Sequence, residues 1–202
     1  MSYYDEHVLP RILNVMMGVE DISVERRKCL AEVRGDVLEV GFGSGLNLPH
    51  YPRGVKSVVA IDPSRVSAKL ARKRIEQAPF PVEYLPLTGE EISAPDASFD
   101  SVVSTFTLCT IPDVAAALRQ IRRVLKPDGR FFFVEHGRSD EPSVQRWQDR
   151  LNGVEKFLAG GCNLNRDMKQ LIAGAGFEIL TLENYYAKGP KVATYLYRGI
   201  AQ

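Results

Sequence analysis

The stretch Val37-Leu38-Glu39-Val40-Gly41-Phe42-Gly43-Ser44-Gly45 decides the fold that we expect for this chain. It reads as a short apolar strand that runs into a glycine-rich turn, and a segment compatible with a helix follows. Because glycine has no Cβ, a ligand can lie directly against the backbone N–H groups of such a turn. The stretch therefore predicts the first strand and the ligand loop of an α/β nucleotide-binding fold.

A carboxylate after the next apolar strand strengthens this interpretation. Residues 57–61 read as a buried strand that ends in Asp62, about 20 residues after the first glycine. A carboxylate at this place can accept hydrogen bonds from both hydroxyls of a ribose. A glycine-rich turn on its own can be a tight turn with no ligand, but the two features together favour a nucleotide site.

The glycine spacing and a neighbouring carboxylate discriminate between nucleotides. In the dinucleotide fingerprint G-x-G-x-x-G, the last glycine would stand where this chain has Leu46. Glu39, just before the first glycine, disfavours an anion and suits a ligand that carries an ammonium or sulfonium charge. A nicotinamide-dependent oxidoreductase is therefore an alternative, but a disfavoured one.

Strands and helices alternate along the chain, which is the pattern of a doubly wound sheet. We expect helices over 6–19, 24–33, 65–77, 113–125, 142–159 and 166–174, and strands over 37–40, 57–62, 82–85, 99–105, 130–135, 176–180 and 193–200, with a turn at 126–129. Ligands of such sheets bind beyond the carboxyl ends of the strands. The candidate residues at those ends are Asp62, Gly89, Glu90, Ser104, Thr105, Glu135 and His136.

Length and composition favour one domain with a small-molecule partner. The chain has 202 residues, 45% of them hydrophobic, which allows a substantial core without disulfides. A net charge of +1 lacks the electrostatic signature of a dedicated nucleic-acid binder. The sequence also shows no secretory signal and no stretch that could span a bilayer. We expect a cytoplasmic protein, and the sequence leaves its oligomeric state open.

Cysteine and histidine spacing gives no metal site. Cys29, Cys109 and Cys162 are far apart and form no C-x-x-C pair, which argues against a disulfide framework and against a thiolate zinc site. The three histidines form no ligand spacing either. We therefore expect no metal, and free cysteines fit a reducing compartment.

Residues Glu39, Gly41, Gly43 and Gly45 resemble the E-x-G-x-G-x-G signature of class I S-adenosylmethionine-dependent methyltransferases. The resemblance implies a Rossmann-like seven-stranded sheet with the last strand antiparallel, in a single domain over 1–202. Residues 1–34 would form an N-terminal helical cap and 35–202 the core. It also implies S-adenosylmethionine as cofactor, bound by Glu39, Gly41, Gly43, Gly45, Asp62, Pro63, Gly89, Glu90, Ser104 and Thr105. In many relatives an aspartate binds the adenine amino group where this chain has Thr88, so that contact would pass to Gly89 and Glu90.

Two further resemblances concern the acceptor. Residues 95–100 and 124–130 are similar to motifs of the ubiquinone-biosynthesis type of methyltransferase. Residues 102–111, 133–136 and 161–166 are similar to the thiol S-methyltransferases of animal microsomes and their bacterial relatives. The animal enzymes carry an N-terminal membrane anchor that this sequence does not show, so the acceptor and the location stay open.

Methyl transfer from a sulfonium requires mainly alignment of donor and acceptor in a shielded pocket. A thiol acceptor needs only a base of modest strength, and our candidate for the base or orienter is His136, with Glu135 beside it. A purely structural role of both residues is an open alternative. Candidate acceptor-pocket residues are Met16, Cys109, Cys162 and Asn163, although core packing explains Met16 and Cys109 equally well.

Three functions follow for testing. The leading hypothesis is methyl transfer to a small, lipophilic acceptor such as a thiol, with a quinol precursor or a phospholipid amine as further acceptors. The second is the nicotinamide-dependent oxidoreductase. The third is a non-catalytic protein that binds the cofactor without turnover.

Overall fold

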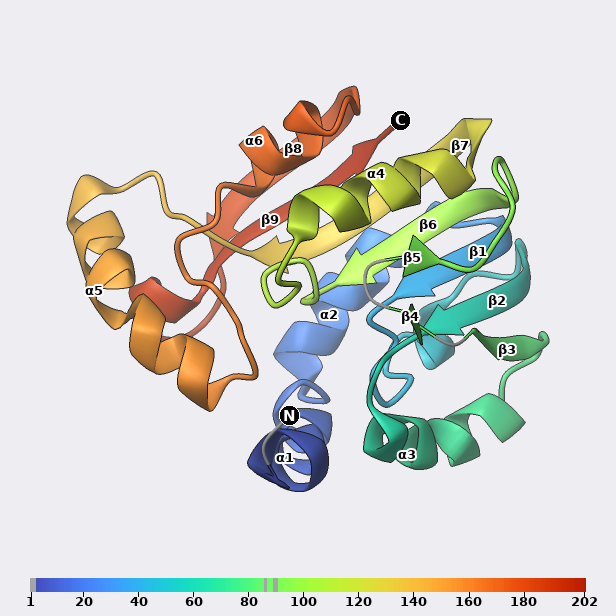
Figure 1. Ribbon diagram of the computed structural model, residues 1–202, viewed down its shortest axis with the longest axis horizontal. Coiled ribbons are helices and arrows are strands. Elements are labelled where there is room, and N and C mark those ends of the chain that lie inside the picture. Colours follow the sequence, from blue (N-terminus) through green and yellow to red (C-terminus); the bar gives the residue numbers. More distant parts are fainter. Residues whose placement is uncertain (1–2, 86, 89–90) are drawn as a thin grey trace.

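The structure, a computed structural model, describes residues 3–85, 87–88 and 91–202. Its centre is a seven-stranded sheet with helices on both faces (Figure 1). The strands follow the order β3-β2-β1-β6-β7-β9-β8, and β9 is antiparallel to both of its neighbours. The predicted seven-stranded sheet with an antiparallel last strand is thereby confirmed.

The strands of this sheet are β1 (Gly35–Val40), β2 (Val55–Ile61), β3 (Val82–Leu85), β6 (Phe99–Thr105), β7 (Leu125–His136), β8 (Ile179–Tyr186) and β9 (Tyr195–Ala201). A separate two-stranded hairpin consists of β4 (Leu87–Thr88) and β5 (Glu91–Ile92). The helices are α1 (Leu9–Met16), α2 (Glu20–Leu30), α3 (Arg65–Glu76), α4 (Val114–Val124), α5 (Pro142–Leu158) and α6 (Met168–Gly174), with short turns η1 (Tyr4–Val8), η2 (Leu48–His50) and η3 (Lys191–Ala193).

Neighbouring residues of the central strands point into two different cores. Phe131 and Phe133 pack in the core that α4 and α6 cover, whereas Phe132 packs in the core on the α2 and α3 side (Figure 1). Val102 and Val103 of β6 divide in the same way. Because both faces are covered, continuous apolar runs form central strands of a parallel sheet.

Local capping explains where several helices begin. The hydroxyl of Ser64 accepts a hydrogen bond from the N–H of Ser67 at 3.1 Å, and the carboxylate of Asp113 accepts one from the N–H of Ala116 at 2.8 Å. These bonds satisfy N–H groups that have no partner inside the helix. The predicted start of α3 after Ser64 is confirmed.

Several predicted boundaries are wrong: the helix expected over 24–33 is α2 (Glu20–Leu30), and the helix expected over 6–19 ends at Met16. Residues 126–129 were expected as a turn, but they form an irregularity inside β7, where the pairing jumps from Phe99 opposite Leu125 to Ser101 opposite Arg130. The strand expected at 176–180 instead spans β8 (Ile179–Tyr186). Gly176 has φ +87° and closes helix α6, and β8 is an edge strand with many polar, exposed residues, so its apolar alternation is weak.

None of the helices in the described part of the chain combines the length and the apolarity needed to cross a bilayer.

Candidate cofactor and acceptor site

The glycine turn after β1 has an open side above Gly43. Gly41, Gly43 and Gly45 have φ of +75°, +57° and +75°, which L residues with a side chain rarely adopt. A Cβ on Gly41 would lie 2.0 Å from Oγ1 of Thr107, so the turn packs against the loop after β6. A Cβ on Gly43 would meet no atom closer than 3.9 Å. A ligand can therefore approach the backbone at Gly43.

The carboxylate of Asp62 connects the glycine turn to the start of α3. One oxygen accepts a hydrogen bond from the N–H of Gly43 and the other from the N–H of Ser64, both at 2.8 Å. Burial raises the pKa of Asp62, and the two N–H donors partly offset this effect. Each oxygen keeps a further lone pair, so Asp62 can also accept hydrogen bonds from ribose hydroxyls.

Glu39 lies fully inside the protein at the end of β1. The side-chain amide of Asn47 donates to Oε1 at 2.8 Å, and the hydroxyl of Tyr51 donates to Oε2 at 2.6 Å. Burial raises the pKa of Glu39 to about 7, against the effects of these two donors and of the nearby Arg26.

Arg26 of α2 connects this carboxylate to β6. Its guanidinium donates to the side-chain oxygen of Asn47 at 2.9 Å and to Oγ1 of Thr105 at 2.6 Å. Burial lowers the pKa of Arg26. Glu39 and Arg26 are not in direct contact, and Asn47 stands between the two charges.

Three residues around Glu39 were not predicted from the sequence: Arg26, Asn47 and Tyr51. Asn47 and Tyr51 follow the glycine turn closely, and an amide and a hydroxyl within reach of a buried carboxylate could have been a signal. Arg26 stands in a run of charged residues on α2, and nothing in that run distinguishes the one cation that points inward.

Glu135 at the end of β7 holds the loop after β6. Its carboxylate accepts hydrogen bonds from the hydroxyl of Ser104 at 2.7 Å and from the N–H groups of Thr107 at 2.9 Å and Cys109 at 3.4 Å. Burial raises the pKa of Glu135 to about 7. Since the hydroxyl of Ser104 donates a hydrogen bond to Glu135, these two side chains position each other. The catalytic role expected for Glu135 and the cofactor-binding role expected for Ser104 stay predictions.

Three of the four predicted acceptor-pocket residues meet beside His136. Nδ1 of His136 lies 3.6 Å from Sγ of Cys162, and Cys109 and Cys162 pack in the same apolar core. The neighbouring Cys109 and His136 lower the pKa of Cys162, whereas the neighbouring Cys162 and burial raise the pKa of Cys109. The backbone N–H and the side-chain amide of Asn163 both donate to the carbonyl of Cys109 at 2.9 Å. Met16 is 59% exposed on α1 and is not part of this group.

Three buried side-chain polar atoms in the described part of the chain have no hydrogen-bond partner: Nε of Arg26, Oη of Tyr84 and Nε2 of His136. Tyr84 packs edge-on against Phe42 of the glycine turn, with ring centroids 5.3 Å apart. A buried polar group without a partner costs on the order of 1–3 kcal/mol. These atoms stand around the carboxyl ends of the strands and are available to a polar ligand. The predicted contacts of Gly89 and Glu90 lie outside the described residues.

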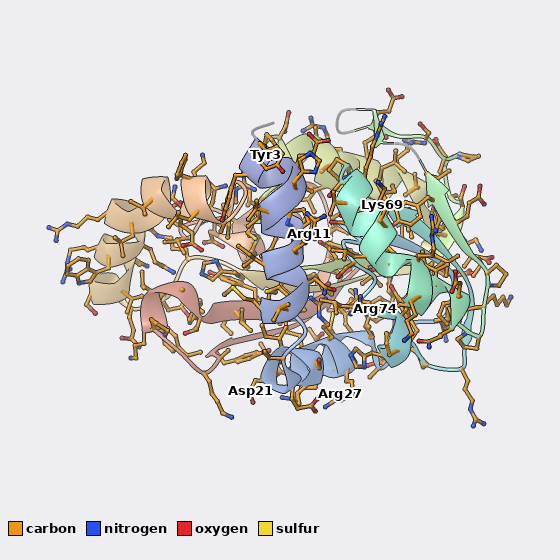
Figure 2. The ribbon with its side chains drawn as sticks, turned by 90° about the horizontal axis from the view of Figure 1, so that it is seen from below. Tyr3, Arg11, Asp21, Arg27, Lys69 and Arg74 are labelled. Atoms are coloured by element: carbon orange, nitrogen blue, oxygen red, sulfur yellow. The ribbon has the colours of Figure 1, made fainter. Side chains whose placement is uncertain are left out.

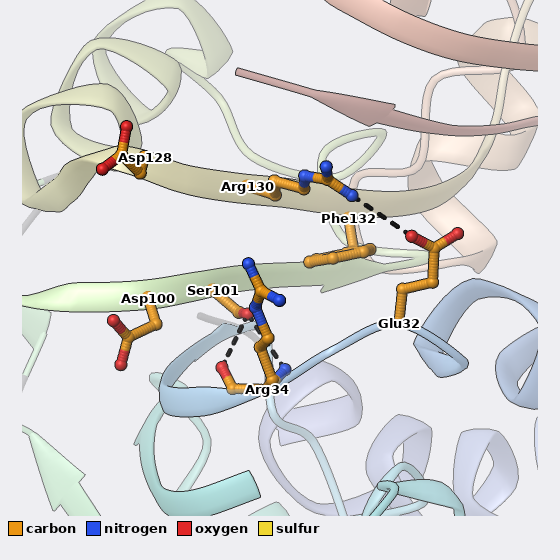
Figure 3. A pocket seen from close by; sticks show the side chains of 7 residues that line it. All are labelled: Glu32, Arg34, Asp100, Ser101, Asp128, Arg130 and Phe132. Carbon is orange, nitrogen blue, oxygen red and sulfur yellow. Dashed lines mark hydrogen bonds and ion pairs between the residues drawn. The ribbon is translucent and has the colours of Figure 1, made fainter. Parts of the chain in front are cut away.

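A cavity of about 250 Å³ lies at the opposite end of the strands, near the amino ends of β6 and β7 (Figure 3). It is lined by Glu32, Arg34, Asp100, Ser101, Asp128, Arg130 and Phe132. Its charges are of both signs, and Arg130 pairs with Glu32 at 3.2 Å. The cavity contains none of the predicted site residues.

Comparison with known proteins gives the family. The methyltransferase domain family matches residues 38–133, from β1 into β7. The human thiol S-methyltransferase TMT1A is 35% identical over 155 residues, which cover 75% of this chain and 63% of that protein. This chain belongs to the class I S-adenosylmethionine-dependent methyltransferases. The cofactor is accordingly S-adenosylmethionine, as predicted.

Other relatives of this methyltransferase act on other acceptors. A phosphatidylethanolamine N-methyltransferase of Cereibacter sphaeroides is 34% identical over 139 residues, which cover 66% of this chain and 64% of that protein. The chain thus spans somewhat less than two thirds of the length of these curated relatives.

Solved structures agree in fold. A SAM-dependent methyltransferase of Aquifex aeolicus has a TM-score of 0.64 at 18% identity, covering 95% of this chain and 97% of that one. The [4+2]-cyclase SpnF has a TM-score of 0.69 at 19% identity, covering 89% of this chain and 78% of that one. Since a cyclase shares the fold, the fold does not determine the reaction.

Proposed function

We propose that this methyltransferase transfers a methyl group from S-adenosylmethionine to a small, lipophilic thiol. The observation that carries the proposal is the environment of His136 at the end of β7. Its imidazole is buried, its Nδ1 faces Cys162, and its Nε2 has no partner. This arrangement leaves one ring nitrogen available to an acceptor.

The residues around the glycine turn fit the cofactor. When bound, S-adenosylmethionine supplies an electrophilic methyl group on a sulfonium centre. Asp62 would hold the ribose hydroxyls, and the open backbone at Gly43 would lie under the methionine part. Glu39 and its partners would lie near the positive end of the ligand, where a carboxylate is favourable.

His136 would accept the proton of the acceptor. In the arrangement that we propose, the Nδ1–H of His136 points at Sγ of Cys162, 3.6 Å away, and the pKa of that thiol is lowered by its neighbours Cys109 and His136. In the neutral imidazole this bond leaves the lone pair on Nε2. A free thiol has a pKa of about 8.5, so an imidazole is a base strong enough to help form the thiolate nucleophile.

The relatives support two acceptor classes. The thiol is supported by the 35% identity to the human thiol S-methyltransferase. A phospholipid amine is the second candidate, because the phosphatidylethanolamine N-methyltransferase is nearly as similar. A cluster of free thiols would work only in a reducing compartment, in line with the cytoplasmic location that we propose.

The test is methyl transfer from isotopically labelled S-adenosylmethionine to an alkyl thiol, a quinol precursor and a phospholipid amine in parallel, with product mass as the readout. We expect a labelled thioether. If only another acceptor is labelled, the thiol assignment is wrong and the methyltransferase assignment stands. If cofactor binds and no acceptor is labelled, a non-catalytic binding protein is favoured.

A further inference from the structure

Exposed apolar side chains are concentrated on two neighbouring segments. Among the described residues, the exposed large apolar side chains are Tyr3, Val8, Ile12, Leu13, Val15, Met16 and Val19 near the N-terminus, Trp147, Leu151, Val154, Phe157 and Leu158 on α5, and Leu180 on β8. Only Leu180 lies outside these two segments. Exposed apolar side chains that gather in one region of a protein mark an interaction site.

On α5 the apolar side chains form one stripe. Trp147, Leu151, Val154 and Leu158 follow each other at intervals of four, three and four residues, so they share one helix face. Phe157, which is 79% exposed, stands beside this stripe. The buried residues of α5, Val144 and Gln148, lie about a quarter turn from this stripe, next to Leu151, so the stripe borders the side of the helix that packs on the core.

On α1 the exposed stripe has the same character, and the two stripes are joined. Val8, Ile12 and Val15 recur at helical spacing, and the exposed Val19 follows after the turn that ends α1. The hydroxyl of Tyr4 donates to the carbonyl of Leu158 at 3.0 Å, at the end of α5. The two segments therefore meet near the start of α1 and the end of α5, and we call their exposed apolar side chains together the α1–α5 face.

Cations flank the α1–α5 face on both sides. On α5, the guanidinium of Arg150 stands 5.5 Å from the ring centroid of Trp147, and Arg146 is one turn away. On the other side lies α3, tied to α1 by a hydrogen bond from Arg74 to Asn14 at 3.1 Å (Figure 2). The exposed charged residues of α3 are Arg65, Lys69, Arg72, Lys73 and Glu76.

We propose that the α1–α5 face docks on the surface of an anionic lipid bilayer. A helix with tryptophan, phenylalanine and leucine on one face and cations at its border lies in the interface of such a membrane. Anionic head groups would attract the flanking cations while the apolar side chains enter the acyl boundary. A second copy of the chain is a less suitable partner for the α1–α5 face, because contact between two such faces would place the flanking cations of one copy against those of the other.

The face borders the acceptor side of the proposed site. The loop that follows α5 carries Cys162 and Asn163, and Leu9 of α1 packs where a Cβ on Gly160 would stand. A docked molecule would thus present this loop toward the bilayer. Docking does not depend on which acceptor is used, but a lipophilic acceptor dissolved in the membrane would have a short path to the site.

The test uses the full chain and its only tryptophan, Trp147, which lies in the face. The protein is mixed with vesicles of phosphatidylcholine alone or with 30% phosphatidylglycerol (about one anionic lipid in three, enough for a surface potential). We expect co-sedimentation and a blue shift of the fluorescence with the anionic vesicles, both reduced by salt. Absence of both with anionic vesicles would overturn the proposal, as would a tryptophan shift that depends on protein concentration without lipid, which would indicate self-association.

Matched variants separate docking from folding. Phe157→Ser combined with Val154→Ser removes two exposed apolar side chains, and we expect at least about tenfold weaker partitioning with an unchanged melting temperature. The control is Leu180→Ser, since Leu180 is an exposed apolar residue outside the face. Equal partitioning of the double variant and the control would contradict the proposal, whether or not methyl transfer is detected.

Discussion

Nδ1 of His136 lies 3.6 Å from Sγ of Cys162, although the two residues are 26 positions apart and belong to a strand end and a loop. The contact orients the imidazole so that the other ring nitrogen, Nε2, stays without a partner. Cys109 packs in the same apolar core as Cys162, and its carbonyl accepts hydrogen bonds from the neighbouring Asn163. Because Nε2 has no partner within the protein, His136 is our candidate for the base that accepts a proton from the acceptor.

Replacing His136 by glutamine should lower kcat for a thiol acceptor by about 10²-fold or more, because the proton acceptor at Nε2 is lost. The affinity for S-adenosylmethionine should stay within about twofold, since no hydrogen bond of His136 reaches the glycine turn. Steady-state kinetics and calorimetry measure the two quantities. Cys29→Ser is the matched control, because Cys29 is buried in the core on the α2 side. Unchanged kcat over the whole pH range would make His136 structural.

Asp62→Ala should weaken cofactor binding by about 1–3 kcal/mol, because charge-assisted hydrogen bonds to the ribose are lost. The control is Asp100→Ala. Asp100 also accepts a backbone N–H, that of Asp36 at 2.8 Å, but it lies where β6 begins. Titration calorimetry should give a raised Kd for the first variant only. Equal Kd values for the two variants would remove Asp62 from the site.

Stability should depend on pH through Glu39. Its pKa is about 7 in the folded protein and about 4.5 when exposed, so between these values the folded state holds a proton that the unfolded state has released. This contribution to stability is present below about pH 4.5 and is lost as the pH rises to about 7, on the order of 3 kcal/mol at most.

Glu39→Gln isolates this effect from the other titrating groups. Without cofactor, the Tm of the variant relative to the natural sequence should rise between pH 5 and pH 8, because the variant has no carboxyl to deprotonate. Differential scanning calorimetry at four pH values measures this difference. Parallel Tm curves would show that Glu39 keeps an ordinary pKa.

Arg26→Ala should destabilise the fold by about 3 kcal/mol, because it leaves Glu39 buried without a nearby cation and removes donors from Asn47 and Thr105. Arg27→Ala is the matched control, since Arg27 is exposed and pairs with Glu20 on the surface, where such a pair contributes about 0–1 kcal/mol. Urea unfolding should separate the two variants clearly. Similar midpoints would mean that Arg26 contributes no more than a surface cation.

The fold and the cofactor turn were predictable because their signals are local. The apolar runs around Val37 and Phe132 predict strands, and the glycines from Gly41 to Gly45 predict a turn. Asp62 marks the end of a strand, and each of these signals lies within a few residues. The order of alternating strands and helices then leaves few topologies. Edge strand β8 was misplaced because an edge strand needs no strong apolar alternation.

Contacts between distant segments were decided only by the tertiary structure. Arg26 reaches Thr105, 79 residues further along the chain, and the loop that carries Cys162 and Asn163 contacts both His136 and the carbonyl of Cys109. The joining of α1 and α5 into one exposed apolar face has the same origin. Residue spacing describes which side of a helix or strand is apolar, but which side chains come together depends on how the elements pack, and no short stretch of sequence contains that information.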